Sequence, residues 1–463
     1  MRVFYRQTWL ICRQTNQLIL MTSQRIHALF LGFLLALCTL QAQEAPSPIV
    51  SGPMVGYAEM REVLLWVQTN GSAKVQFEYS NGEQTFRTPI YLTQAPEAFT
   101  ARLVANQVKP GETYTYKVFI NDQPVEFDYD LTFKTPPLWQ WRSDPPEMKI
   151  ALGSCVYVND PPYDRPGKGY GGEYEIFNAL HAEKPDMMLW LGDNTYLREA
   201  DWYSRTGVFH RYTHTRNLPE MQPLLASTSN YAIWDDHDYG PNNSDRSFRN
   251  KDLTFEAFKL FWGNPTYGID RDVTGAISMF EWGDAHFFLL DDRYHRDPNN
   301  KKIENRAILG KPQLDWIVDA LISSNAKWKF VCVGGQVLNT VDRFENFAAI
   351  APEEREYLIE SIARQGIRNV IFLTGDRHHS ELSMVERYGI KIYDFTASPL
   401  TSGSHDASDE PNQARIEGSH VGVRNYGLIN ISGERTDRSL RLSLHGVDGS
   451  ELWHYDIPEQ KRD

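Results

Sequence analysis

The spacing of hydrophobic residues changes once along the chain, near residue 140. Between residues 63 and 118 lie short runs rich in β-branched and aromatic residues, several of which are apolar at every second position (63–67, 74–79 and 114–118). Such alternation is typical of half-buried strands. Asn70-Gly71, Asn81-Gly82 and Pro110-Gly111 supply turn residues between the runs. The pattern predicts a small all-β sandwich over residues 46–137.

After Pro146 the pattern predicts strands that alternate with helices. Residues 149–153, 187–191, 328–333 and 369–373 are short, largely apolar runs, as expected of strands buried on both faces. Residues 173–183, 314–322 and 353–365 instead repeat apolar positions at the helical period of 3.6. This order predicts a layered αββα domain over residues 146–457, with sheets inside and helices outside. Two domains also suit the 463 residues, which exceed what one core usually supports.

The N-terminal segment has the pattern of a signal peptide. Arg25 and His27 precede the apolar run 28–37, which is too short to span a membrane comfortably, and Ala42 ends a suitable cleavage sequence. We expect residues 1–42 to be removed and the protein to be exported to a periplasmic, cell-surface or extracellular location. The alternative is an uncleaved anchor helix, whereas cleavage would leave no stable membrane anchor.

The formal net charge of −13 argues against nonspecific binding to nucleic acid, which requires a basic surface. An acidic protein can still process a small phosphoester, provided that metal ions supply local positive charge. The sequence does not indicate an oligomeric state. Cleavage after residue 42 would leave Cys155 and Cys332, too few and too distant for a disulfide framework.

Residues of the types that commonly ligate metals follow directly after five of the predicted strands. They are Ser154-Cys155, Gly192-Asp193-Asn194-Thr195-Tyr196, Asp235-Asp236-His237-Asp238, Gly334-Gly335-Gln336 and Gly375-Asp376-Arg377-His378-His379. Each cluster alone is ordinary, since a Gly-Asp pair after a strand is most often a turn or a helix cap. Together they concentrate carboxylates at strand ends, where α/β proteins bind ligands, and bound cations would neutralise that charge. The sequence therefore predicts one metal site.

Four of these motifs, in this order and spacing, resemble the PhoD-type alkaline phosphatases, which are calcineurin-like metallophosphoesterases. The motifs are Gly-Ser-Cys at Cys155, Gly-Asp-x-x-Tyr at Asp193, Trp-Asp-Asp-His-Asp at Asp236 and Thr-Gly-Asp-x-His at Asp376. The resemblance covers about residues 50–457. It implies a four-layer αββα metallophosphoesterase sandwich. Residues 108–116 resemble the turn-then-strand signature of fibronectin type III-like modules, so the preceding β-sandwich is expected to be of that type.

The resemblance also implies a role for each residue. Asp193 would bridge two metals. Cys155, Tyr196 and His378 would ligate the first metal, whereas Asp236, Asp376 and, less certainly, Gln336 would ligate the second. His237 would act as general acid beside the scissile phosphate. Related enzymes typically carry His at the Cys155 position and Asn at the Asp236 position, so this ligand set is more anionic.

That ligand chemistry bears on the metals. A thiolate and a phenolate on one ion favour iron(III), and carboxylate and amide oxygens suit Ca²⁺ or Mg²⁺. The resemblance implies Fe³⁺ with Ca²⁺, although composition alone does not separate these ions from Zn²⁺, Mn²⁺ or Mg²⁺. Asn194, Arg216, Arg377 and His379 are candidate phosphate contacts.

The sequence thus predicts a metal-dependent phosphatase that hydrolyses phosphoric esters, including diesters, by attack of a metal-activated hydroxide. One alternative is a phosphodiesterase or phospholipase-type hydrolase on the same scaffold, because flanking loops set specificity. Another is a noncatalytic surface protein that metal ions stabilise. The Tyr-, Pro- and Gly-rich segment 157–172 either shapes substrate access or forms an ordinary surface loop.

Overall fold

The computed structural model describes residues 47–461. The predicted signal peptide lies outside the described residues, so it stays a prediction. Within the described range, no helix combines the length and the apolar character needed to cross a membrane.

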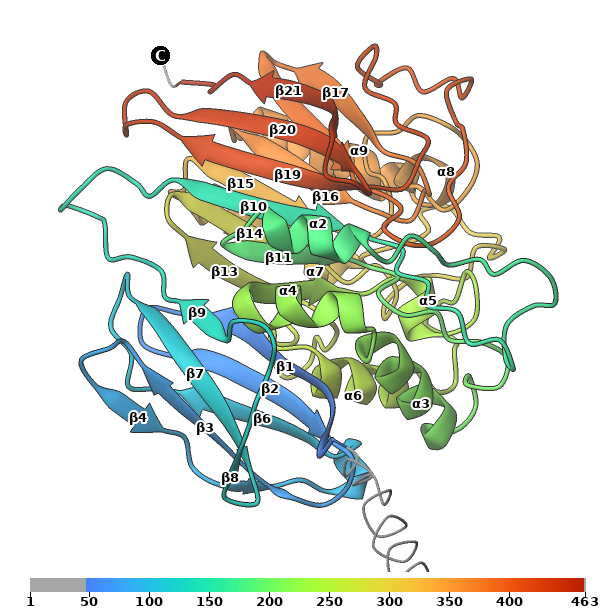
Figure 1. Cartoon of the computed structure of the whole chain (residues 1–463). Coiled ribbons are helices and arrows are strands. Elements are labelled where there is room, and N and C mark those ends of the chain that lie inside the picture. Colours follow the sequence, from blue (N-terminus) through green and yellow to red (C-terminus); the bar gives the residue numbers. More distant parts are fainter. Residues whose placement is uncertain (1–46, 462–463) are drawn as a thin grey trace, which may run out of the picture. The chain divides into compact units, whose positions relative to one another are not determined.

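The larger sheet has nine strands in the order β21-β20-β19-β10-β11-β12-β1-β2-β6 (Figure 1). Their bounds are β1 (Ile49–Ala58), β2 (Val63–Thr69), β6 (Thr100–Ala105), β10 (Met148–Gly153), β11 (Met187–Leu191), β12 (Ser229–Ile233), β19 (Asn425–Ser432), β20 (Ser439–Gly446) and β21 (Glu451–Ile457). The central strands β10, β11, β12 and β1 are parallel, and the other pairs are antiparallel. Parallel pairing places the carboxyl ends of β10, β11 and β12 at one edge.

The second sheet has six strands in the order β13-β14-β15-β16-β18-β17. Their bounds are β13 (Ser278–Trp282), β14 (Ala285–Leu289), β15 (Trp328–Cys332), β16 (Val370–Thr374), β17 (Glu381–Arg387) and β18 (Ile390–Thr396). Strands β14, β15, β16 and β18 run parallel, so their carboxyl ends also share one edge.

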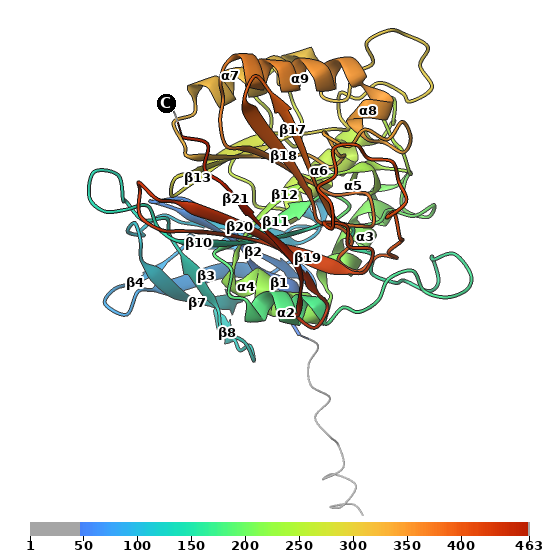
Figure 2. The same cartoon turned by 90° about the horizontal axis from the view of Figure 1, so that it is seen from above.

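Helices cover the outer faces of both sheets. They are α2 (Ile176–Ala182), α3 (Arg205–Arg216), α4 (Gln222–Ser227), α5 (Asp236–Tyr239), α6 (Lys251–Phe261), α7 (Lys311–Ser323), α8 (Phe347–Ile350) and α9 (Pro352–Arg364), with 3₁₀ turns η1 (Ala95–Glu97) and η2 (Pro219–Met221). Figure 2 shows α7 and α9 beyond the second sheet, and α2 and α4 beyond the larger one.

Alternation of side chains along the strands explains these layers. On β11, Leu189 packs into the core between the two sheets, whereas Trp190 packs with the helices on the outer face. On β16, Leu373 joins the same central core and Phe372 packs under α7 and α9. A strand apolar at every position is therefore buried on both faces. The predicted four-layer αββα sandwich is confirmed.

The N-terminal region is all β, as predicted, and its strands divide between two sheets. A third sheet contains β3 (Lys74–Ser80), β4 (Thr85–Arg87), β5 (Tyr91–Leu92), β7 (Thr113–Ile120), β8 (Gln123–Val125) and β9 (Thr132–Lys134). Strands β1, β2 and β6 extend the larger sheet instead, where Val55 pairs with Ser229 of β12. The larger sheet therefore includes strands from before and after residues 137–146. The predicted domain boundary at those residues stays a prediction.

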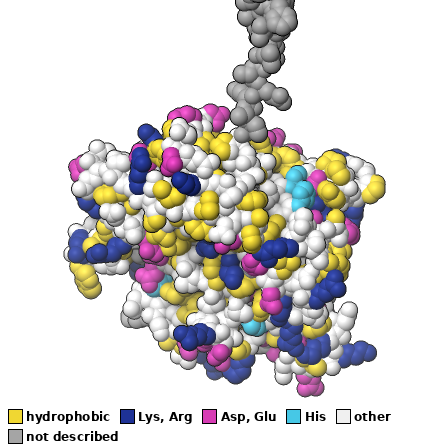
Figure 3. Space-filling model, turned by 90° about the horizontal axis from the view of Figure 1, so that it is seen from below, with side chains coloured by type: hydrophobic (Ala, Val, Ile, Leu, Met, Phe, Trp, Pro, Cys, Tyr) yellow, Lys and Arg dark blue, Asp and Glu magenta, His cyan; other side chains and the backbone are white. Residues whose placement is uncertain are grey.

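The surface carries charges of both signs. On the face that Figure 3 displays, basic and acidic side chains are interspersed with hydrophobic ones.

Candidate metal centre

The loops after four parallel strands bring the predicted ligands together. Cys155 follows β10 and Asp193 follows β11, and Cys155 Sγ lies 3.8 Å from Asp193 Oδ2. Asp376 follows β16 of the second sheet, and its backbone oxygen lies 3.6 Å from Cys155 Sγ. Asp236 opens α5 after β12. Residues far apart in sequence thus meet at the carboxyl ends of both sheets.

The backbone at these positions is unusual. Cys155, Asp193, Asp376 and His378 have φ angles of 62°, 51°, 63° and 57°, in the left-handed region that non-glycine residues rarely adopt. Each such residue costs about 1–3 kcal/mol, and this kind of strain concentrates at functional sites. Four of them among the predicted ligands indicate that the fold holds the site at the expense of local stability.

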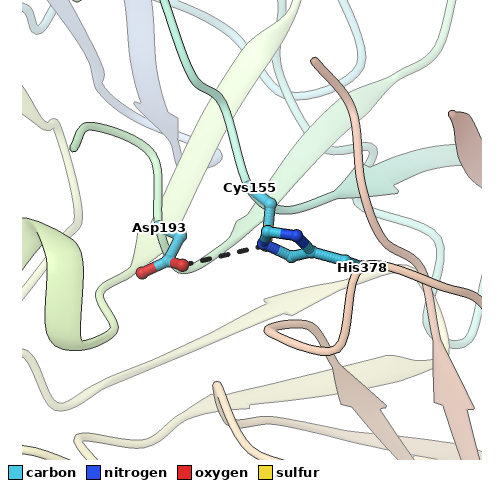
Figure 4. A group of neighbouring side chains, drawn as sticks. All are labelled: Cys155, Asp193 and His378. Carbon is cyan, nitrogen blue, oxygen red and sulfur yellow. Dashed lines mark hydrogen bonds between the residues drawn. The ribbon is translucent and has the colours of Figure 1, made fainter. Parts of the chain in front are cut away.

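The first ligand group contains Cys155, Asp193 and His378. One candidate ligand atom from each lies within 4.8 Å of the others, and Figure 4 shows the side chains converging from separate loops. Tyr196 completes the group, because its Oη lies 3.2 Å from His378 Nε2. Burial lowers the pKa of His378 to about 4, so the ring is neutral and can ligate at neutral pH.

A cation is needed to ionise this group. Burial, and then the charge of Asp193, raises the pKa of the Cys155 thiol well above its ordinary value. Burial and Asp193 likewise raise the pKa of the Tyr196 phenol. A bound metal reverses this effect by stabilising the thiolate and the phenolate directly. The buried thiol and phenol therefore fit a metal site.

The second ligand group shares Asp193 with the first and adds Asp236 and His237, again with candidate atoms within 4.8 Å of one another. Asp236 Oδ1 and His237 Nδ1 are buried without a hydrogen-bond partner among the described residues. Burial, and then Asp236, raises the pKa of Asp376 to about 6. Carboxylates crowded this closely, with an orphaned oxygen, fit a cation that neutralises them.

Buried hydrogen bonds fix the turn that carries Asp236. The Asp235 carboxylate caps α5 by accepting from the Asp236 backbone N–H, and Asp238 Oδ2 accepts from the N–H groups of Asp235 and Asn194. Arg293 Nε donates to Asp235 Oδ1 over 2.5 Å. The side chains of Asp235 and Asp238 thus bind backbone N–H groups and hold the turn that carries Asp236.

The side chains of Gln336, Arg377 and His379 hydrogen-bond to residues outside the two ligand groups. Gln336 Nε2 donates to Glu381, and its Oε1 accepts from Arg377 Nη1 over 2.7 Å. Arg377 is 3% exposed and also donates to Glu410. His379 is fully buried, and its Nδ1 lies 3.0 Å from the Arg377 backbone oxygen. All three side chains lie in a buried network beside the site, so the arrangement supports neither the predicted ligand role of Gln336 nor the predicted phosphate contacts.

Asn194 and Arg216 also lie away from the cavity beside the metal ligands. The Asn194 amide donates to the Ile233 backbone oxygen over 2.7 Å. Arg216 is buried with its guanidinium carbon 3.8 Å from the centre of the Trp262 ring. Their predicted role as phosphate contacts is not supported, because both side chains pack inside the fold.

A cavity of about 430 Å³ opens beside the two ligand groups. Its lining combines the ligand positions with residues that sequence reasoning missed, namely Arg165, Lys168, Tyr170, Arg198, Asn242 and Asn243. Tyr170 Oη lies 2.9 Å from His378 Nδ1, so the segment 157–172 reaches the metal site. The missed residues lie close in sequence to the motifs, but loops have no periodicity that would show which side chains face inward.

Comparisons with known proteins identify the family and a curated relative of this chain. A family model described as "PhoD-like phosphatase" matches residues 154–437, and a domain of unknown function, DUF7800, matches residues 46–138. Alkaline phosphatase D of Bacillus subtilis (strain 168) is 24% identical over 383 residues, covering 70% of this chain. The chain spans 62% of the length of that relative.

Solved structures show the same fold. The structure of PhoD matches with a TM-score of 0.72 at 17% identity, covering 91% of this chain and 94% of that chain. Purple acid phosphatase PPD1 from yellow lupin (Lupinus luteus) seeds matches with a TM-score of 0.65 at 12% identity. The match covers 88% of this chain and 74% of the lupin chain. The fold therefore defines the class as a metallophosphoesterase sandwich. Within that class, the chain belongs to the PhoD-like phosphatase family.

Proposed function

We propose that this protein is an exported, metal-dependent hydrolase of phosphoric monoesters and diesters. The observation that carries the proposal is the pair of ligand groups that share Asp193 and border a 430 Å³ cavity. Family membership supports phosphoester chemistry. The apolar segment 28–37 supports export.

One ion would be held by Cys155, Tyr196 and His378. The other ion would be held by Asp236 and Asp376, and Asp193 would bind both ions. The soft and anionic donors suit Fe³⁺ at the first position, and the carboxylates suit Ca²⁺ at the second. When bound, two such ions would polarise the phosphoryl oxygens and lower the pKa of a water molecule.

His237 would donate a proton to the leaving oxygen. The ring borders the cavity, and its centroid lies 4.3 Å from that of Tyr196. Its Nδ1 is buried and has no hydrogen-bond partner among the described residues, so this nitrogen is free to bind an ion instead. General acids of this kind contribute about 10²–10⁴-fold to the rate.

Leaving-group dependence separates these two roles of His237. We expect His237→Asn to lower kcat for glycerol phosphate, whose alkoxide must be protonated, far more than for p-nitrophenyl phosphate, whose phenolate leaves unaided. Equal losses together with a lower metal content would assign His237 as a ligand instead. Asp272→Asn, which changes an exposed residue outside the cavity lining, is the matched control.

Chelation tests the proposed function as a whole. Activity on p-nitrophenyl phosphate and bis-p-nitrophenyl phosphate should vanish when the metals are removed and return when they are restored. Full activity in metal-free protein would refute metal dependence. Undetectable diester turnover by the metal-loaded protein would restrict the function to monoesters. Lack of hydrolysis of any ester by metal-loaded protein would favour the noncatalytic alternative.

A further inference from the structure

Two cations on the loop over the cavity have no hydrogen-bond or ion-pair partner in the part of the chain that the structure describes. Arg165 and Lys168 are exposed and line the cavity, and neither forms a hydrogen bond or an ion pair with another described residue. Asp164 also lines the cavity, but its carboxylate oxygens accept from the Tyr157 hydroxyl and the Asp160 backbone N–H, each over 2.7 Å. Asp164 therefore does not form an ion pair with either cation, and both can bind a ligand.

The loop is pinned at its base. The Asn159 amide donates to the Gly171 backbone oxygen over 2.8 Å, and the Gly171 N–H donates back over 2.9 Å. The Gly172 N–H donates to the Thr401 backbone oxygen over 3.0 Å. A loop closed in this way presents its cations over the cavity at a low entropic cost to binding.

Arg198 adds a third cation from the cavity wall. It is 7% exposed, and its Nε has no hydrogen-bond partner among the described residues. The carboxylate of Glu199 lies 3.7 Å from Arg198 Nη2 and is largely exposed. The Leu197 N–H donates to the His237 backbone oxygen over 3.1 Å, which places this segment beside the proposed proton donor. A nearly buried guanidinium with a free donor is costly unless an anion binds it.

We propose that Arg165, Lys168 and Arg198 form a second anion subsite, which binds a further phosphate group on the leaving-group side of the substrate. The inference rests on the proposed function and names its substrate class, phosphoric esters with two phosphate groups. The reacting phosphate would occupy the ligand groups around Asp193. All three cations line the cavity that His237 also borders, so they would face the group that departs. A cavity of about 430 Å³ is within the usual size range of small-molecule sites.

Matched esters test the subsite. Phosphate release from fructose 1-phosphate and fructose 1,6-bisphosphate would be measured with metal-loaded full-length protein. We expect kcat/KM for the bisphosphate to exceed that for the monophosphate by more than the factor of two that a second scissile group supplies. The preference should fall as salt rises from 50 to 500 mM, since exposed charges are screened.

Substitutions locate the effect. Arg165→Gln/Lys168→Gln should lower the bisphosphate preference by about threefold to tenfold, as loss of two exposed ion pairs predicts. Arg198→Gln should lower it as well, and Arg198→Lys should restore part of it. The double variant Arg271→Gln/Lys302→Gln also removes two exposed cations, but neither lines the cavity, so it should leave the preference unchanged.

The outcomes are distinguishable. Hydrolysis of both esters with a ratio of two or less, or a ratio that the loop double variant leaves unchanged, overturns the subsite and leaves the proposed function intact. Absence of hydrolysis of both fructose esters by protein that hydrolyses p-nitrophenyl phosphate overturns the subsite alone, and absence of hydrolysis of all three esters overturns both. Since the loop cations are exposed, their variant should fold even if Arg198→Gln does not.

Discussion

Removing the charge of Arg293 tests how buried ion pairs support the site. Arg293 is fully buried, and it donates to Asp235 over 2.5 Å and to Glu345 over 2.8 Å. Arg293→Met keeps most of the side-chain volume but leaves two buried carboxylates without this cation. Breaking a buried pair in this way costs about 3–5 kcal/mol. The unfolding entropy is about 2 cal/mol/K per residue over residues 47–461, so the midpoint of thermal unfolding should fall by roughly 3–6 °C.

Calorimetry and metal analysis together check this prediction. Arg438→Met is the matched control, because Arg438 is also buried and makes two hydrogen bonds to Asp284, outside the cavity lining. Both variants should lose stability, but only Arg293→Met should lose metal, since Asp235 caps the turn that carries Asp236. An unchanged midpoint in Arg293→Met would refute the energetic reasoning.

A partner substitution separates charge from packing. Glu345 keeps its ion pair with Arg296 at 2.8 Å in Arg293→Met, so Asp235 is the carboxylate that loses its cation. Adding Asp235→Asn to Arg293→Met removes that charge and should recover part of the lost stability. Equal metal contents in Arg293→Met and Arg438→Met would show that the ion pairs stabilise the fold without positioning the site.

Three further predictions concern single positions. Gly192→Ala should lower the free energy of unfolding more than Gly82→Ala does. Both glycines have φ near +90°, but an added Cβ at Gly192 would lie 2.7 Å from Asp235, whereas one at Gly82 would meet no atom within 4 Å. Equal losses on chemical denaturation would contradict this. Tyr170→Phe should weaken metal binding by about 10–100-fold, because it removes the hydrogen bond to the His378 imidazole. An unchanged metal affinity in a competitive chelator titration would refute the role of this contact. Burial raises the pKa of Asp394 to about 6 from 3.8, so the folded state binds the proton more tightly than the unfolded state does. Stability relative to Asp394→Asn should therefore fall by about 2 kcal/mol as pH rises from 4 to 7, and a flat difference would contradict the shift.

The sequence predicts the layers well because strands buried on both faces have a local signature. The apolar run 187–191 coincides with β11. The joining of β1 to β12 has no such signature, because the pairing of Val55 with Ser229 joins residues far apart in the chain.

The same distinction between local and long-range contacts explains which residues of the site could be predicted from the sequence. Cys155, Asp193, Asp236 and Asp376 lie within a few residues of strand ends, so the parallel order of the strands brings them together. The surroundings of Gln336 depend on partners 41 to 60 residues further along the chain, and these engage its amide. No local pattern reports such contacts.

Metal content per chain, measured by inductively coupled plasma mass spectrometry on native protein and on Asp193→Asn, tests the central claim most directly. The account predicts about two ions per native chain, because Asp193 belongs to both ligand groups. It also predicts loss of metal and of phosphatase activity together in the variant, with the fold retained by circular dichroism. An Asp193→Asn protein that keeps both ions, or native protein that is fully active without metal, would contradict it.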